Sequence, residues 1–571
     1  MKKKNPAGTG TRKIITAVLI LFFLMMGFAP ASPAADDVDD LKKQLQSLSE
    51  TMKTLQEKLD KVEKQSAGKE TEIKEMDKRL NKAELHTASD KISFGVDLRS
   101  EAQSIHYEDV RMAPPSMINS FFTPASQGGF NGATQQQIQQ AMAGMKAAGM
   151  VPAPNSYNAN NDIIYTSRLR LNMKGTINPH LDFTGRLAAY KVWGDSSGVQ
   201  FNHGSMGEVT FDGNTSSLPH GDTVHVERAY FNYKQDLGSV PINFSLGRRP
   251  STDGAPLEYG NYSLVGGSPL ASIINWQFDG ASLTFGLEDV TGIPGQAFKL
   301  CYGVGFEGDW GNSYSMTSSS DVNDVHMFGF IADLFDNETT SAVLNYAHAW
   351  DVTDGFTGLT VMPFIVSVDG NNKYTFSPNN GGYISRMQPS TNIGGWDAAS
   401  LLLKTNLREK LANIDLFIAP SWSHTSPSQI SNNPYYALMG QGLLSSNGDL
   451  QSRNGYSIYA GALFPMPLDA RLGLEYNWGS KYWFNFTGAE DSLIGSKLAA
   501  RGQVFEGYYI QPIYKDNFFV KLGGQYYDYD YTGSGNPLGE PVSITDATAF
   551  DSLNAIIDKA WVAYLSATIR F

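Results

Sequence analysis

Arginine is the residue type whose spacing carries the most chemical information in this sequence of 571 residues. Six arginines lie in segments of alternating apolar and polar residues, at positions that would share the inner face of strands. They are Arg99, Arg168, Arg170, Arg186, Arg228 and Arg249. A guanidinium group is always charged at neutral pH. On neighbouring strands, which lie about 4.8 Å apart, these groups would form a positively charged stripe that attracts anions.

Two interpretations of these arginines remain open. Either the stripe is unscreened, which would give a mild preference for anions, or each arginine pairs with an acid on the same face, such as Asp97 or Asp182. Later segments would add inward charges of both signs. These are Lys299, Glu307, Lys404, Asp415, Arg471, Glu475, Glu506 and Lys521. Opposite charges that face each other across a passage orient dipolar solutes.

The sequence offers little for catalysis or for metal binding. The segment GDSSG, from Gly194 to Gly198, matches the nucleophile-elbow pattern, but that pattern needs a strand, a tight turn and a helix, and this one opens a loop. The nine histidines include no pair at the spacing of a metalloprotease helix. Cys301 is the single cysteine, and we interpret it as structural. We expect no enzyme activity, no cofactor and no metal.

Strands are the elements that would position the charges. In the last twelve residues, AWVAYLSATIRF, successive side chains alternate between two faces of an extended strand, and one of these faces is apolar. The apolar face holds Trp561, Ala563, Leu565, Ala567, Ile569 and Phe571. A strand of this length with one apolar face suits a tilted crossing of a bilayer. The alternative is the edge strand of a soluble sheet, which more often carries charge or proline.

The same alternation begins at Lys91 and recurs to the end of the chain in about sixteen segments. Short connections, such as Asn178 to His180 and Lys515 to Asn517, alternate with long ones. The first long connection contains a helical pattern from Thr134 to Met150, which we expect to pack over the mouth of a barrel. The pattern predicts an all-β fold, an antiparallel transmembrane β-barrel of about sixteen strands over residues 90–571.

Two segments precede the predicted barrel. Residues 1–34 have the pattern of a secretory signal peptide, with five positive charges, an apolar run and then small residues. The apolar run is short for a membrane anchor, which is the alternative. Residues 36–88 repeat apolar side chains at spacings of three and four, which predicts an α-helical coiled coil in the periplasm. A single amphipathic helix is the other interpretation, and the leucine-rich pattern is compatible with a trimer.

The region from about Lys91 to Phe571 resembles a Gram-negative outer-membrane porin. The residues that carry the resemblance are RAYFNY at Arg228 to Tyr233, the strand that closes on Gly247-Arg248, and the terminal Phe571. Two further stretches are similar to a family of bacterial outer-membrane proteins catalogued only as a domain of unknown function. They are GRRPSTDGAP from Gly247 to Pro256 and YDYTGSG from Tyr529 to Gly535.

The resemblance implies a passive diffusion channel for small hydrophilic solutes in the bacterial outer membrane. Porins of sixteen strands fold their third outer loop into the barrel, and here that loop follows Arg249 and carries Asp253 and Glu258. The resemblance also implies Phe571 as a membrane-insertion signal for the barrel-assembly machinery. Outer-membrane lipid would surround a homotrimer.

The net charge of −13 becomes more negative once the cations of the signal peptide are removed, which makes nucleic acid a poor partner. Three other functions are alternatives to the channel. A barrel sheath around an electron-transfer partner would need a lumen that the third loop does not plug. A tether to the cell wall through the coiled coil is compatible with the channel. A hydrolytic barrel would need a serine and histidine pair, which the sequence does not assemble.

Overall fold

The computed structural model divides the chain into two compact units, residues 1–90 and residues 91–571. In the second unit it describes residues 92–571 except 195–208, 211–223, 264–265, 309–321, 356, 362–363, 381–383, 388, 410, 434–437, 439–443, 445–448, 488–491 and 536–538. In the first unit it describes eight positions between 46 and 58, all of them helical. Apart from these eight positions, the predicted signal peptide (1–34) and coiled coil (36–88) lie outside the described residues.

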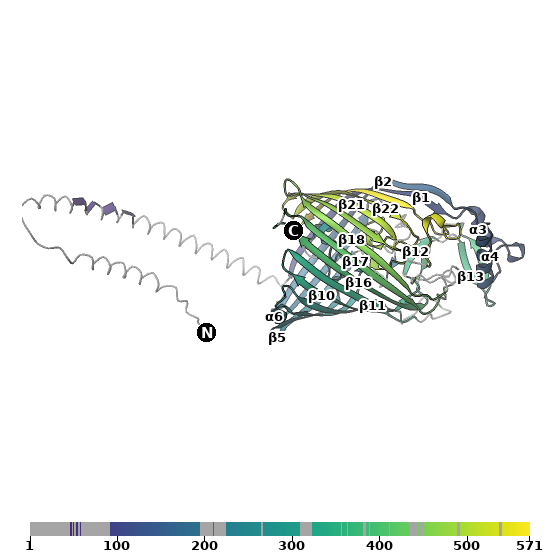
Figure 1. The fold of residues 1–571 in the computed structure, drawn as a ribbon, viewed down its shortest axis with the longest axis horizontal. Coiled ribbons are helices and arrows are strands. Elements are labelled where there is room, and N and C mark those ends of the chain that lie inside the picture. Colours follow the sequence, from purple (N-terminus) through teal and green to yellow (C-terminus); the bar gives the residue numbers. More distant parts are fainter. Residues whose placement is uncertain are drawn as a thin grey trace, which may run out of the picture. The chain divides into compact units, whose positions relative to one another are not determined.

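Sixteen strands of the described region pair in sequence order, each antiparallel to the next, and the first pairs with the last (Figure 1). The sheet therefore closes into a barrel, and the predicted fold and strand number are confirmed. The strands are β1 (Ile92–Met112), β2 (Asn155–Asn178), β3 (Leu181–Val192), β5 (Val224–Leu237), β6 (Val240–Arg248), β8 (Asp279–Gly286), β9 (Ala297–Phe306), β10 (Val325–Asp336), β11 (Thr340–Thr353), β16 (Asn392–Asn406), β17 (Asp415–Pro427), β18 (Arg453–Pro465), β19 (Arg471–Gly479), β21 (Gly502–Tyr514), β22 (Phe518–Tyr529) and β23 (Lys559–Arg570).

The alternation along each strand separates an outer face from an inner face. On β23, Val562 and Tyr564 point inward and are buried, whereas the next residue, Leu565, points outward and is 50% exposed. Large apolar side chains are exposed on the outer face of β1 as well, and Phe94 reaches 64%. Exposed apolar surface on this scale is unfavourable in water and favourable in hydrocarbon. The outer face is therefore that of a barrel that spans a membrane.

Eight long connections, which we number L1 to L8, join the strands at one end of the barrel. They cover residues 113–154, 193–223, 249–278, 307–324, 354–391, 428–452, 480–501 and 530–558. Their smaller elements are α3 (Pro115–Phe122), η1 (Ala125–Gln127) and α4 (Gln135–Ala147) in L1; β4 (Val209–Thr210) in L2; α5 (Glu258–Asn261) and β7 (Ile274–Asn275) in L3; β12 (Thr357–Val361), β13 (Phe364–Val368), β14 (Tyr374–Pro378) and β15 (Ile384–Met387) in L5; β20 (Phe486–Thr487) and η3 (Lys497–Ala499) in L7; and η4 (Ile544–Asp546) in L8. The connections at the other end are shorter, and one of them contains α6 (Glu288–Thr291).

The long loops pack into a cap at their end of the barrel, where α3, α4 and β13 lie in Figure 1. Phe121 of α3, Ile138 of α4, Phe364 of β13 and Phe550 of L8 belong to one buried apolar cluster. The Thr134 hydroxyl accepts a hydrogen bond from the Gln137 backbone N–H, so α4 begins where the sequence predicts a helix. Among the described residues, no helix is both long enough and apolar enough to cross a membrane.

The carboxyl-terminal residue completes the seam between the first and last strands. The backbone N–H of Val96 donates to the Phe571 carbonyl at 2.7 Å, and the Phe571 N–H donates to the Val96 carbonyl at 3.0 Å. The Phe571 side chain is 76% exposed and lies beyond the end of β23. Phe571 thus offers an exposed aromatic ring and two backbone hydrogen bonds at the point where the barrel closes.

We expect deletion of Phe571 to reduce the amount of folded barrel in the outer membrane, because it removes both seam hydrogen bonds and the exposed ring. Heat-modifiable mobility of the membrane fraction on a gel measures folded barrel directly. Phe571→Tyr is the matched control, since it keeps the backbone and an aromatic ring and should assemble normally. Normal assembly of the deletion variant would show that the terminal residue is dispensable.

Candidate functional site

Loop L3 lies inside the barrel and contacts opposite walls. Near its start, the Thr252 carbonyl accepts a hydrogen bond from Arg228 of β5 at 3.3 Å. Further along, the Leu270 N–H donates to Asn345 of β11 at 2.9 Å. Buried apolar residues of L3, including Leu257, Leu270 and Ala271, pack with Leu402 of β16 and with other side chains of the far wall. The third loop thus occupies the lumen, as the resemblance to porins implied.

The middle of L3 is held against the later strands by ionic and aromatic contacts. Lys404 of β16 donates to the Glu258 carboxylate at 3.1 Å. The next residue, Tyr259, stacks on Phe417 of β17 with ring centroids 5.4 Å apart and planes 3° from parallel. Tyr262 donates to Asp516, in the turn before β22, at 2.7 Å. L3 therefore reaches from the loop end of the barrel to the turn end.

Several predicted arginines meet at one wall, where L3 brings an acid to them. Arg170 of β2 contacts Asp253 of L3 at 3.1 Å and Glu227 of β5 at 3.0 Å. Arg186 of β3 contacts the same two carboxylates, Glu227 at 3.3 Å and Asp253 at 3.7 Å. Arg168 pairs instead with Asp97 of β1 at 2.9 Å. Of the two interpretations of the arginines, pairing therefore describes Arg168, Arg170 and Arg186.

Glu227 is a central member of this wall that the sequence pattern did not reveal. Strict alternation puts Glu227 on the outer face, because its neighbour Arg228 faces inward. The pairing of β3 with β5 shifts by one residue here, since Arg186 is opposite Arg228 while Leu187 is opposite Val226. Such a β-bulge lets two consecutive residues turn to the same side. Glu227 and Arg228 are accordingly both buried, with 3% and 4% exposure.

Asp253 is positioned by the conformation of L3. Its backbone is left-handed, with φ 59°, a conformation that aspartate adopts more readily than most residues. Its N–H donates to Asn275 of β7 at 2.9 Å, which ties the start of L3 to its end. Burial by itself would raise the pKa of the Asp253 carboxyl, but Arg170 and Arg186 outweigh it and hold the pKa below its usual value. Asp253 therefore stays charged at neutral pH.

The other predicted site residues lie apart from this wall. Arg249 donates to Ser245 of β6 and lies over the Tyr230 ring, 4.9 Å from its centroid. Arg99 of β1 borders a small cavity beside Gly260 and Asn261, which we call the tip of L3. Glu258 contacts the far wall through Lys404. The six arginines are thus divided among three surroundings.

A second buried ionic cluster joins L7 to the wall opposite the start of L3. Glu475 of β19 and Glu506 of β21 are directly opposite each other in the sheet, and Lys497 of η3 forms ion pairs with both. Three tyrosine hydroxyls donate to the same two carboxylates. They belong to Tyr459, Tyr508 and Tyr564. The sequence predicted the inward acids but not Lys497, because loop residues follow no alternation.

L7 and L3 are also bonded to each other. Strand β20 of L7 pairs in parallel with β7 of L3, Phe486 opposite Ile274. Asn485 of L7 donates to the Ser272 carbonyl of L3 at 2.9 Å. Trp276, Trp483 and Phe486 belong to one fully buried cluster. The two loops therefore form a single body within the lumen.

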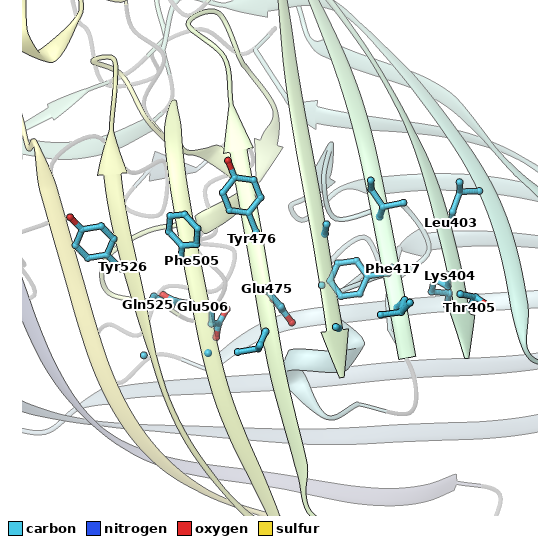
Figure 2. Close-up of a pocket in the computed structure, with 18 of the residues that line it drawn as sticks. Leu403, Lys404, Thr405, Phe417, Glu475, Tyr476, Phe505, Glu506, Gln525 and Tyr526 are labelled. Atoms are coloured by element: carbon cyan, nitrogen blue, oxygen red, sulfur yellow. The ribbon is translucent and has the colours of Figure 1, made fainter. Parts of the chain in front are cut away.

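A large depression of the surface lies on the outer face rather than in the lumen. It has a volume of about 1360 Å³ and follows one cross-strand row from β11 to β23. Figure 2 shows Tyr476, Phe505 and Tyr526 on neighbouring strands, beside the row that contains Glu475 and Glu506. Since both glutamates are buried and the tyrosines and phenylalanine are not, the exposed lining belongs to the lipid-facing side.

The histidines, Cys301 and the GDSSG segment form no metal or catalytic cluster in the part of the chain that the structure describes. No group of three His, Cys, Asp or Glu side chains there could hold a metal ion. Cys301 of β9 lines a cavity of about 80 Å³ against L3. Most of the GDSSG segment lies outside the described residues.

A family model described as "Protein of unknown function (DUF3373)" matches residues 158–571. No curated protein matches the sequence. Among solved structures, the chain is similar to OprB of Pseudomonas putida, with 10% identity, 84% of this chain and 94% of that chain covered, and a TM-score of 0.40. OmpF of Salmonella typhi has 11% identity, with 83% of this chain and 97% of that chain covered and a TM-score of 0.36. An anion-selective porin from Comamonas acidovorans has 11% identity, with 84% of this chain and 99% of that chain covered and a TM-score of 0.37. These likenesses are distant, and the barrel architecture stands on the strand pairing described above.

We expect Lys497→Met to destabilise the barrel, because it leaves Glu475 beside Glu506 without the cation between them. Removing one partner of a buried ion pair typically costs about 3–5 kcal/mol. The temperature at which heat-modifiable mobility is lost should therefore fall. Adding Glu475→Gln should restore much of the loss, since Glu506 keeps Lys521 at 3.6 Å.

Lys481→Met is the matched control for this prediction. Lys481 lies in the same loop, but its side chain is 37% exposed and pairs with Glu540 at the surface. Exposed ion pairs contribute about 0–1 kcal/mol, so the control should change little. Equal effects of the two lysine variants would contradict the assigned role of the buried cluster.

Proposed function

The chain belongs to the family described as proteins of unknown function, DUF3373, and we propose that it is an outer-membrane porin, a passive diffusion channel for small hydrophilic solutes. The observation that carries the proposal is a closed barrel with an apolar outer face whose lumen holds a charged loop against a charged wall. A barrel of this kind crosses the membrane without exposing unpaired backbone to lipid. Polar groups then remain available inside it for solutes.

In this proposal the inward arginines, Asp253 and Glu258 determine which solutes pass. Arg170 and Arg228 are buried and contact L3, so they act by holding this loop in place, whereas Arg168 pairs with Asp97 of β1. The wall contains four guanidinium groups, from Arg168, Arg170, Arg186 and Arg228, and three carboxylates, from Asp97, Glu227 and Asp253. Arg570 also contacts Asp97, at 2.8 Å. The remaining positive charge supports a mild preference for anions.

The alternatives receive less support from the same observations. A sheath for an electron-transfer partner needs an unobstructed lumen, and L3 and L7 occupy it. A tether to the cell wall would use the segment 36–88 and is compatible with a channel. A hydrolytic function has no residues assigned to it, and we propose none.

Conductance in a planar bilayer tests the proposal. The purified full chain should give discrete current steps and, under a salt gradient, a small reversal potential of the sign expected for anion preference. At about 0.1 M salt charges act over roughly 10 Å and at about 1 M over roughly 3 Å, so the preference should shrink as salt rises. Absence of current at every voltage would refute the channel and favour the tether.

Asp253→Asn should increase the anion preference, because it removes one of the acids that neutralise Arg170 and Arg186. The reversal potential in a salt gradient near 0.1 M should shift further toward anions. Asp369→Asn is the matched control, because Asp369 lies in the turn between β13 and β14 in the cap and should have no effect. A reversal potential that Asp253→Asn leaves unchanged would separate this wall from selectivity.

We also propose that residues 36–88 form a periplasmic coiled coil that supports a homotrimer. Removing these residues should leave the barrel folded, because its strands close on one another. It should weaken the oligomer if the helices associate. Mass measurement of the full chain and the shortened chain in mild detergent tests this, and an equal oligomer mass would show that the helices do not hold the assembly.

A further inference from the structure

A polar cavity of about 70 Å³ lies between the tip of L3, the inner segment of L7 and one wall of the barrel. The wall consists of the neighbouring strands β21, β22, β23 and β1. Gly260 and Asn261 come from L3, and Ser492 and Lys497 from L7. Charges of both signs border the space, since Arg99 and Lys521 face it together with Glu101 and Glu506. Three separate parts of the chain thus present polar groups to one enclosed volume.

The opposite flank of L3 is tied to the wall by ion pairs. There, the Asp253 carboxylate of L3 lies 3.1 Å from Arg170 and 3.7 Å from Arg186. Against β8 to β11, the flank of L3 borders a mainly apolar cavity that contains Cys301, Phe278 and Met327. A hydrated solute loses its hydrogen bonds among such side chains. The polar cavity at the tip is therefore the favourable place for a solute to pass.

On the basis of the proposed function, we propose that solutes cross L3 at this gap, between Asn261 and the wall of β22, β23 and β1. Segment 492–497 of L7 forms its lid. Leu493 and Ile494 pack with Ile105 and Tyr107 of β1, and Lys497 fastens the segment to Glu475 and Glu506.

The size and charges of the gap define the class of solute. A volume of about 70 Å³ exceeds the roughly 10–15 Å³ that a single water molecule needs, but it admits only compact solutes. Acidic and basic side chains in one small space suit a compact zwitterion, whose two charges each find a partner. We therefore assign small zwitterions of the size of glycine to this route, and exclude oligosaccharides. Proteoliposomes with the full chain should swell in glycine and not in raffinose.

Cysteine accessibility distinguishes the proposed route from the other cavity. The protein provides the comparison itself, because its native Cys301 lines the cavity on the other flank of L3. The test variant carries Asn261→Cys together with Cys301→Ser, and a second carries Gln525→Cys with Cys301→Ser on the facing wall. Each protein is treated in a planar bilayer with a charged methanethiosulfonate reagent, and labelling is checked by mass.

The expected result is that the reagent removes most of the current from both test variants and leaves the wild-type current unchanged. Labelled test variants with full current, or conducting variants that are not labelled, would overturn the route. Block of the wild-type current through Cys301 would move the route to the other flank of L3. If wild-type protein carries no current, the porin proposal fails, and the route that rests on it fails with it. Swelling at equal rates in glycine and raffinose would overturn the solute class alone.

Discussion

The contacts of Asp253 with Arg170 and Arg186 hold the interior of the barrel in its arrangement. Buried charges are costly unless each has a partner, so the arginines of β2 and β3 require acids at that depth. The sheet supplies one of them, Glu227, and L3 supplies the other. L3 therefore cannot leave the lumen without exposing two guanidinium groups to an incomplete set of partners. The position of the loop follows from this electrostatic demand.

L7 extends the same constraint across the lumen. Lys497 forms ion pairs with both Glu475 and Glu506, which lie opposite each other on neighbouring strands and would otherwise repel each other. The pairing of β7 with β20 then makes L3 and L7 one body. Ion pairs thus anchor this body at two sides of the barrel, and its aromatic residues fill the space between them. The gap beside Asn261 lies where the body meets the wall through polar groups.

The outer surface favours apolar side chains instead of paired charges, because it faces the hydrocarbon of the membrane. Apolar side chains face outward on every strand pair that the structure describes in the β18 to β23 region, including Ile458, Leu474 and Leu522. The buried ion pairs of Glu475, Glu506 and Lys497 lie on the inner face of these strands. The strands therefore serve two environments at once, which is possible because successive side chains point to opposite sides.

The sequence by itself determined the barrel. A strand's side chains alternate with a period of two, which is a local property, so the strands, the short turns and the inward direction of Arg170, Arg186, Glu475 and Glu506 were predictable from sequence. The resemblance to porins added the entry of the third loop. Only the tertiary structure decided which residues form ion pairs with these inward charges. Glu227 turns inward only because the pairing of β3 with β5 slips by one residue, and Lys497 reaches two strands from a loop with no periodicity. Which charges neutralise one another depends on register and loop path, and these arise from contacts between residues far apart in the chain.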